Sequence, residues 1–109
     1  MAPAASASSL VAVNRARNAS AVTGLLSSGL SGYSLNHSDT GGHTAVSSPL
    51  LKVQRSKELL QRWMELNAFT TIFRTHEGNR PDENHQFFSD AESLAHFSRC
   101  AKIYTAWAF

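Results

Sequence analysis

Polar side chains that could take part in chemistry are concentrated in two stretches of this 109-residue chain. The first stretch contains His37, Asp39 and His43. Carboxylates and imidazoles can bind polar ligands, act as general acids or bases, or ligate metal ions. The second stretch offers Arg74, His76, Glu77, Asn79, Arg80, Asp82, Glu83, Asn84 and His85.

Each polar stretch follows a segment that reads as a short strand. Residues 32–37 alternate partly in polarity, and residues 69–74 are rich in β-branched and aromatic side chains, so both segments predict strands. Between them, residues 55–67 predict a helix. Its apolar stripe repeats at helical spacing and consists of Leu59, Leu60, Trp63, Met64 and Leu66, of which Trp63 and Met64 are expected in the core.

A second helix is predicted after the second polar stretch. Ser89 and Glu92 have the spacing of a capping box, which places the helix start near Asp90. Cys100 is expected to be a small buried residue of this helix. The stripe that continues to the C-terminus consists of Leu94, Phe97, Ala101, Tyr104 and Ala108.

The predicted order of strand, loop, helix, strand, loop and helix corresponds to two βα units in series. Such units imply an α/β fold with a parallel sheet, whose two loops lie side by side. Tyr33 is expected in its core. Two units cannot close a (β/α)8 barrel, which needs about 250 residues. Because the last helix also runs to the final Phe109 without a stop signal, the chain is expected to be a fragment of a larger fold.

The first twenty residues differ from the rest. Residues 1–20 are rich in Ala and Ser, and they contain Arg15 and Arg17 but no acid. They predict a disordered or misassigned segment, with a transit peptide as the alternative. Residues 21–109 are therefore expected to form the globular part.

Composition excludes several classes of function. The net charge is only +2 and the basic residues form no stripe, so no nucleic-acid partner is expected. No apolar run approaches the roughly 18 residues that a membrane span needs. The single cysteine cannot form an internal disulfide, which leaves a reducing compartment as the default, but the sequence does not fix the localisation.

Three motifs resemble glycoside hydrolase family 31. Residues 32–43 (GYSLNHSDTGGH) are similar to the loop that follows the acid/base in that family, and the His-Ser-Asp form is closest to its sulfoquinovosidase branch. Residues 55–63 (RSKELLQRW) and 73–81 (FRTHEGNRP) are similar to the same branch. The resemblance implies a fragment, over residues 21–109, of the (β/α)8 TIM barrel of a retaining α-glycosidase. Its substrate would be a carbohydrate, an α-glucoside or sulfoquinovoside, and no cofactor or metal is expected.

The resemblance also implies roles for four residues. Asp39 and His76 match the residues that bind sugar hydroxyls in the minus-one subsite, and Arg74 would have a supporting role. His43 stands where the family has an aromatic residue, which in sulfoquinovosidases is a tyrosine that helps to hold the sulfonate. Thr40 replaces the usual isoleucine.

The resemblance does not supply catalytic residues. The nucleophile and acid/base of the family are aspartates that precede the residue matching Asp39, and retaining chemistry needs both carboxyl groups. Residues 1–38 contain no Asp and no Glu. No catalytic residue is therefore assigned, and the chain is expected to be inactive by itself.

Other interpretations stay open at this point. Asp39 can be an ordinary turn residue before two glycines, and His76 a solvated loop residue. The loop histidines could belong to a zinc site, although their spacing fits no compact ligand pattern. Glu77, Asp82 and Glu83 could be recruited as a carboxylate pair. The chain could also be a short non-catalytic protein that binds a sugar weakly or not at all.

Overall fold

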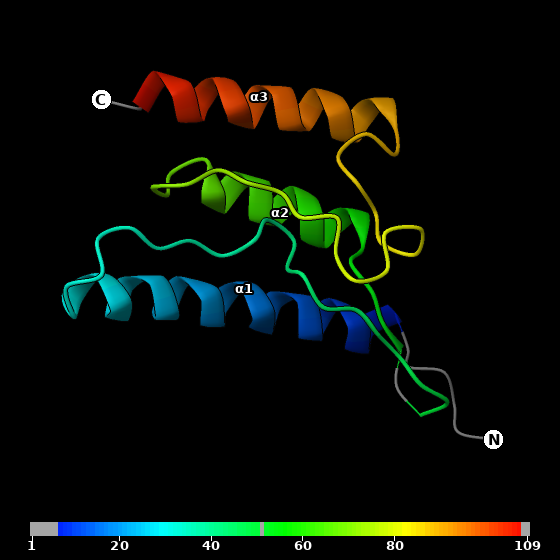
Figure 1. Cartoon of the computed structure of the whole chain (residues 1–109). Coiled ribbons are helices and arrows are strands. Elements are labelled where there is room, and N and C mark those ends of the chain that lie inside the picture. Colours follow the sequence, from blue (N-terminus) through cyan, green and yellow to red (C-terminus); the bar gives the residue numbers. More distant parts are fainter. Residues whose placement is uncertain (1–6, 51, 108–109) are drawn as a thin grey trace.

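The computed structural model describes residues 7–50 and 52–107, and within them the chain forms three helices, which are labelled in Figure 1, and one short hairpin. Helix α2 lies between α1 and α3 and packs against both. The elements in chain order are α1 (Ala7–Leu30), β1 (Val46–Ser47), β2 (Lys52–Val53), α2 (Lys57–Asn67) and α3 (Ala91–Trp107).

Helix α1 ends at a glycine. Gly32 adopts a φ of 94°, which favours glycine because it has no Cβ. The amide of Tyr33 donates to the carbonyl of Ser28 at 3.0 Å and the amide of Gly32 donates to the carbonyl of Gly29 at 3.1 Å, the two bonds of a Schellman motif. The sequence had placed Gly32 at the start of a strand. The helix also runs without a break across residue 20, where the sequence suggested a boundary between a disordered segment and the domain.

Helix α2 agrees with its prediction to within two residues at its start. Ser56 caps it, because its hydroxyl accepts a hydrogen bond from the Leu59 amide at 3.2 Å. Four of the five apolar residues of the stripe are buried, with Trp63 and Met64 at 6% and 0% exposure, and Leu66 is half-buried. The predicted core role of both residues is confirmed.

Helix α3 begins close to its predicted start, but Asp90 caps it instead of Ser89. The Asp90 carboxylate accepts a hydrogen bond from the Ser93 amide at 2.7 Å. The Ser89 hydroxyl accepts one from the Gln86 amide in the preceding turn, and Glu92 pairs with Lys57 of α2. The capping box is therefore wrong in detail: an aspartate one position later accepts the same kind of bond more strongly because it is charged.

The core lies between α2 and α3. It consists of Leu60, Met64, Ala68 and Cys100, with aromatic residues packed around it. The buried position predicted for Cys100 is confirmed, at 3% exposure. Leu94 of the predicted stripe is 49% exposed, so the buried face is rotated from the predicted one, and Ala108 lies outside the described residues. The Phe97 ring stacks on those of Phe73 and Phe87, at centroid distances of 5.3 and 4.5 Å.

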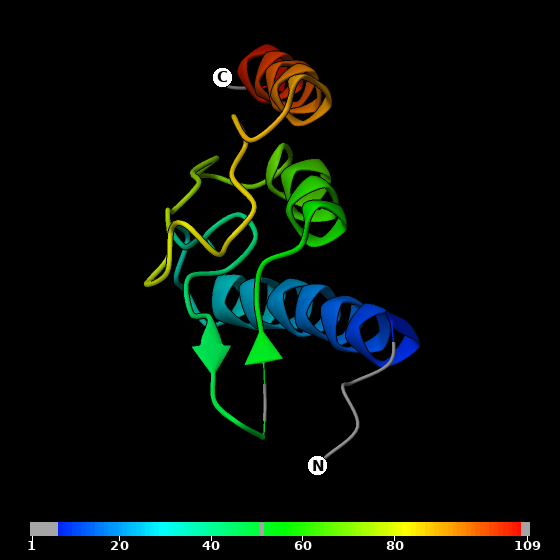
Figure 2. The same ribbon diagram turned by 90° about the vertical axis from the view of Figure 1, so that its right-hand side faces the viewer.

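The two predicted parallel strands do not form. Residues 32–37 and 69–74 form no β-ladder. The Thr71 hydroxyl donates to the Asn36 carbonyl at 2.8 Å, and the backbones pair at a single parallel bridge further on, between Thr40 and Thr75. The sheet in the described residues is instead the antiparallel hairpin β1–β2, on which Val46 pairs with Val53 (Figure 2). A strand of a parallel barrel is hydrogen-bonded to neighbours on both sides, and these segments lack them. Residues 7–50 and 52–107 thus form a small piece with no closed barrel.

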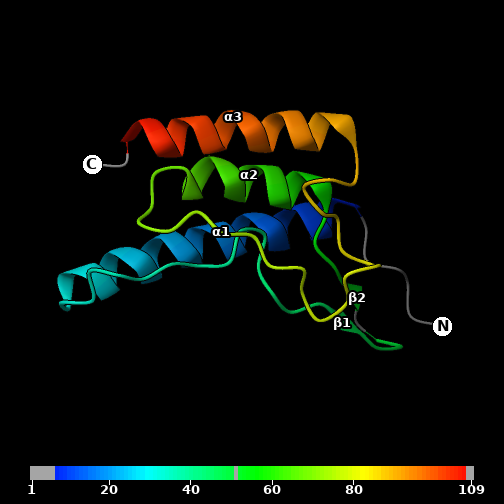
Figure 3. The same ribbon diagram turned by 45° about the horizontal axis from the view of Figure 1, so that its top comes forward.

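The lack of neighbouring strands also explains why one residue predicted to lie in the core is exposed. Tyr33 was expected to be buried but is 69% exposed, and Leu35 is 82% exposed. Both lie in the unpaired segment after α1, at the end of the molecule away from the hairpin (Figure 3). No helix among the described residues is long and apolar enough to cross a membrane.

Candidate functional site

The two polar loops lie side by side, as the sequence predicted. The Thr40 amide donates to the Arg74 carbonyl at 2.9 Å, where the loops begin. Further along, the side-chain amide of Asn79 accepts from the Ala45 amide at 2.7 Å and donates to the Ala45 carbonyl at 3.0 Å. These three hydrogen bonds hold the first loop against the second.

His43 and His76 contact each other across this junction. Their ring centroids are 4.3 Å apart and the rings meet edge to face, with 69° between their planes. His76 is half-buried and its Nδ1 accepts a hydrogen bond from the Gly78 amide at 3.1 Å. A neutral imidazole with an accepting Nδ1 carries its proton on Nε2, so His76 offers an N–H donor at its other nitrogen.

Asp39 begins the tight turn that leads to His43. Its carbonyl accepts a hydrogen bond from the Gly42 amide at 2.7 Å, and Gly41 and Gly42 both have positive φ angles, of 84° and 75°. Within residues 7–50 and 52–107, no hydrogen bond to the Asp39 carboxylate is found. The carboxylate does not cap the turn as the turn-residue interpretation supposed, and it is half-buried with its acceptor capacity open.

Side chains of helix α2 hold the start of the first loop by hydrogen bonds. Asn67 is fully buried, and its amide donates to the Ser38 carbonyl at 2.8 Å and to the Thr40 hydroxyl at 2.9 Å. The indole of Trp63 donates to the Ser38 hydroxyl at 2.9 Å. These bonds fix the residues on both sides of Asp39.

Arg74 is placed differently from the other predicted site residues. Its side chain is exposed, and in the described part of the chain only its carbonyl takes part in a hydrogen bond. The structure therefore brings Asp39, His43 and His76 to one junction, with Arg74 contributing backbone to it.

Arg55 lies at the centre of the site, although the sequence did not predict a role for it there. It was assigned to the start of a helix, yet it precedes the cap Ser56 and is only 5% exposed. Its guanidinium donates to carbonyl groups of both loops and to the Gln86 side chain. Burial lowers the pKa of Arg55 below its usual value, while the Asp39 carboxylate acts in the opposite direction. No local signal could have found it, because its partners lie 13 to 31 residues away.

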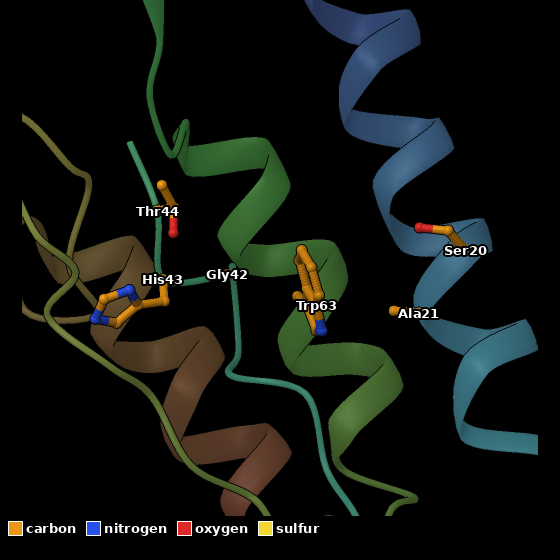
Figure 4. A pocket seen from close by; sticks show the side chains of 6 residues that line it. All are labelled: Ser20, Ala21, Gly42, His43, Thr44 and Trp63. Atoms are coloured by element: carbon orange, nitrogen blue, oxygen red, sulfur yellow. The ribbon is translucent and has the colours of Figure 1, made fainter. Parts of the chain in front are cut away.

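A small hollow opens beside this junction, on the side of α1 (Figure 4). Its volume is about 270 Å³, and it is lined by His43 and Trp63 together with residues from the middle of α1, while the His43 ring points away from α1. The remaining lining residues are Ser20, Ala21, Gly42 and Thr44. A hollow of this size is smaller than typical ligand pockets, so it is at most the edge of a binding site.

Glu77, Asp82 and Glu83 were the loop acids that could have supplied a carboxylate pair, and one of them is engaged with other side chains. Glu83 forms an ion pair with Arg80 at 2.7 Å, and hydrogen bonds from Arg80 and then Gln54 lower the pKa of Glu83. Glu77 and Asp82 are exposed. Among the described residues, no group of three His, Cys, Asp or Glu side chains is arranged to hold a metal ion.

Comparison with known proteins identifies the class. Residues 13–103 match the family described as "Glycosyl hydrolases family 31 TIM-barrel domain". The chain belongs to this family.

Relatives within the family give a finer placement. The chain is 51% identical over 87 residues to a sulfoquinovosidase of Escherichia coli (strain K12) and 48% identical over 87 residues to one of Agrobacterium fabrum. Each match covers 80% of this chain but only 12% of the relative. A solved family 31 sulfoquinovosidase from E. rectale, in complex with an aza-sugar inhibitor, superposes with a TM-score of 0.66 at 44% identity. That match covers 75% of this chain and 12% of the solved one.

Proposed function

We propose that this chain is the part of a retaining α-glycosidase barrel that orients the sugar, and that it is inactive without the rest of the barrel. One observation carries the proposal. Two loops of a segment about half identical to sulfoquinovosidases bring Asp39, His43 and His76 to one junction. All three side chains are partly accessible there.

Asp39 and His76 have complementary hydrogen-bonding capacities. The open carboxylate of Asp39 can accept from two sugar hydroxyls in charge-assisted bonds. His76, with its proton on Nε2, can donate to a hydroxyl oxygen. Such a pair can hold a sugar ring in a fixed orientation, with Arg74 at the rim of the site.

His43 bears on the choice of substrate. In the sulfoquinovosidases that the chain resembles, a tyrosine at this position helps to hold the sulfonate. An imidazole that contacts His76 edge-on can still donate one hydrogen bond, but it is shorter than a phenol. We therefore propose an α-glycoside substrate and leave α-glucoside and sulfoquinovoside to be separated by experiment.

The catalytic carboxylates have to come from outside these 109 residues. A retaining glycosidase needs two carboxyl groups about 5–5.5 Å apart. Asp39 is the first acidic residue of the chain, and its proposed role is to bind substrate. A non-catalytic sugar-binding protein is the second candidate, and the small share of the relatives' length that the chain spans favours keeping it.

A hybrid enzyme tests the proposal. The segment of the E. coli sulfoquinovosidase that aligns with this chain is replaced by the corresponding residues of the chain, and hydrolysis of aryl α-sulfoquinovoside and aryl α-glucoside is measured. The proposal predicts turnover of at least one substrate. A folded hybrid that hydrolyses neither, while the 109-residue chain alone binds the sugars, would favour the non-catalytic candidate.

A further inference from the structure

We infer that Arg55 is the positioning residue of this site, which sets Asp39, His43 and His76 in their relative places; the inference rests on the proposed function. Arg55 belongs to neither loop, because it lies between β2 and the cap of α2. Its side chain nevertheless contacts both of them.

The hydrogen bonds of the guanidinium connect three separate pieces of chain. Nη1 donates to the Gly42 carbonyl, directly before His43, at 3.3 Å, and also to the carbonyl of His76 itself. Nε donates to the His85 carbonyl at 2.8 Å. One planar group therefore joins the backbone at both histidines to the far end of the second loop.

The remaining contacts satisfy the group and bring in the third site residue. Nη2 donates to the Glu77 carbonyl at 3.4 Å and to the Gln86 side chain, which is itself buried. The charge of Arg55 interacts favourably with the Asp39 carboxylate. His76 is thus connected to Arg55 through its own carbonyl, His43 through the carbonyl of Gly42, and Asp39 through charge.

Gly41 makes room for this arrangement. A Cβ at Gly41 would lie 2.3 Å from Cδ of Arg55, and Gly41 has a positive φ. The first loop therefore closes directly over the stem of Arg55. A lysine has three donors on a point charge and cannot reproduce the planar fork of five donors that this junction uses.

Burying a charge among neutral carbonyls is weak evidence for a contribution to stability, because desolvation opposes the gain. The geometry of Arg55 instead points to a role in orienting the loops. His76 supplies a direct readout of that role. Its Nδ1 accepts from the Gly78 amide only while the second loop keeps its present shape.

The test uses the 109-residue chain with ¹⁵N-labelled histidines. Long-range ¹H–¹⁵N spectra distinguish a protonated from an unprotonated ring nitrogen. The expected wild-type result is one neutral tautomer of His76, with Nδ1 unprotonated. Arg55→Lys and Arg55→Ala should lose this single tautomer, and methylguanidinium at millimolar concentration should restore it in Arg55→Ala. Arg62→Lys and Arg62→Ala are the controls. Arg62 lies on α2, and among the described residues its side chain pairs only with Glu65, so its variants should keep the tautomer.

Several results would overturn the inference. The first is a wild-type chain in which His76 shows no single tautomer, and the second is an Arg55→Lys variant that keeps this tautomer. The third is global unfolding of both Arg55 variants, which would mean that Arg55 contributes to stability only. Failure of guanidinium rescue in a folded Arg55→Ala would do the same. None of these readouts involves a sugar, so an inactive hybrid enzyme would reject the proposed function without affecting this test.

Discussion

Asn79 and Ala45 exchange two hydrogen bonds between the candidate site's loops, at 2.7 and 3.0 Å. The Asn79 side-chain amide takes the role that a neighbouring strand's backbone has in a β-ladder, since it satisfies both the N–H and the C=O of Ala45. We predict that Asn79→Ala lowers the free energy of unfolding by about 1–2 kcal/mol, the range for two partly exposed bonds. Urea denaturation measures it. Asn36→Ala, which removes one local bond to the Tyr33 carbonyl, is the control and should cost clearly less; equal losses would contradict the prediction.

Gly78 should not tolerate a side chain. It has a φ of 88°, and a Cβ there would lie 2.9 Å from the His43 carbonyl oxygen and 2.7 Å from Nδ2 of Asn84. The backbone oxygen cannot rotate away, so Gly78→Ala should destabilise the chain by more than about 1 kcal/mol. Gly24→Ala, in the open surface of α1, should instead stabilise it by about 0.5–1 kcal/mol. Thermal melting of both variants checks the opposite signs.

Stability should fall in acid through Asp90. The Ser93 amide first, and then Lys57, lower the pKa of Asp90 from 3.8 to about 2. A folded-state pKa below the unfolded value means that the contribution is present above pH 3.8 and is lost as the pH falls towards 2. The denaturation midpoint should drop over this window. Asp90→Asn can still cap the helix, and its midpoint should drop less; parallel pH curves for the two proteins would refute the assignment.

Elements with strong local signals could be predicted from the sequence. Helix α2 has both an apolar stripe and a serine cap, and it begins within two residues of its predicted start. The resemblance to glycoside hydrolase family 31 likewise placed Asp39, His43 and His76 in one predicted sugar-binding site. The prediction of the two strands was wrong because strand pairing depends on neighbouring segments, and a local sequence pattern carries no information about them.

Arg55 shows a second limit. A charged residue just before a helix cap normally indicates a solvated position, since lone charges are rarely buried. Its five acceptors are mostly carbonyl groups, which every residue has, so their positions leave no trace in the sequence. Only the folded loops reveal that they converge on one guanidinium.

The chain should associate with itself through the end that carries Leu35, Phe69 and Trp107. These residues are 82%, 68% and 62% exposed, and they line one hollow of about 550 Å³. Exposed apolar groups of this kind favour association. Phe69→Lys should shift sedimentation towards the monomer. Leu50→Lys removes an apolar residue near the hairpin that is even more exposed, at 87%, and should leave the association unchanged; an equal effect of both variants would contradict this location.

The last prediction concerns the hybrid enzyme. Asp39→Ala should lower kcat there by roughly a hundredfold, equivalent to about 2.7 kcal/mol. The reason is that carboxylate bonds to sugar hydroxyls strengthen as the ring distorts towards the oxocarbenium-like transition state, so their loss raises the barrier and not only the KM.

Asp39→Asn keeps the shape but replaces one accepting oxygen with a donor, and it should retain only part of the turnover. His76→Ala should have a milder effect, because a neutral imidazole binds a hydroxyl less strongly than a carboxylate. Asp82→Ala, in an exposed part of the second loop, is the matched control and should leave both constants unchanged. Steady-state kinetics on both aryl substrates measure the effects. If Asp39→Ala keeps near-parental kcat while Asp82→Ala does too, Asp39 is a turn residue and the sugar site lies elsewhere.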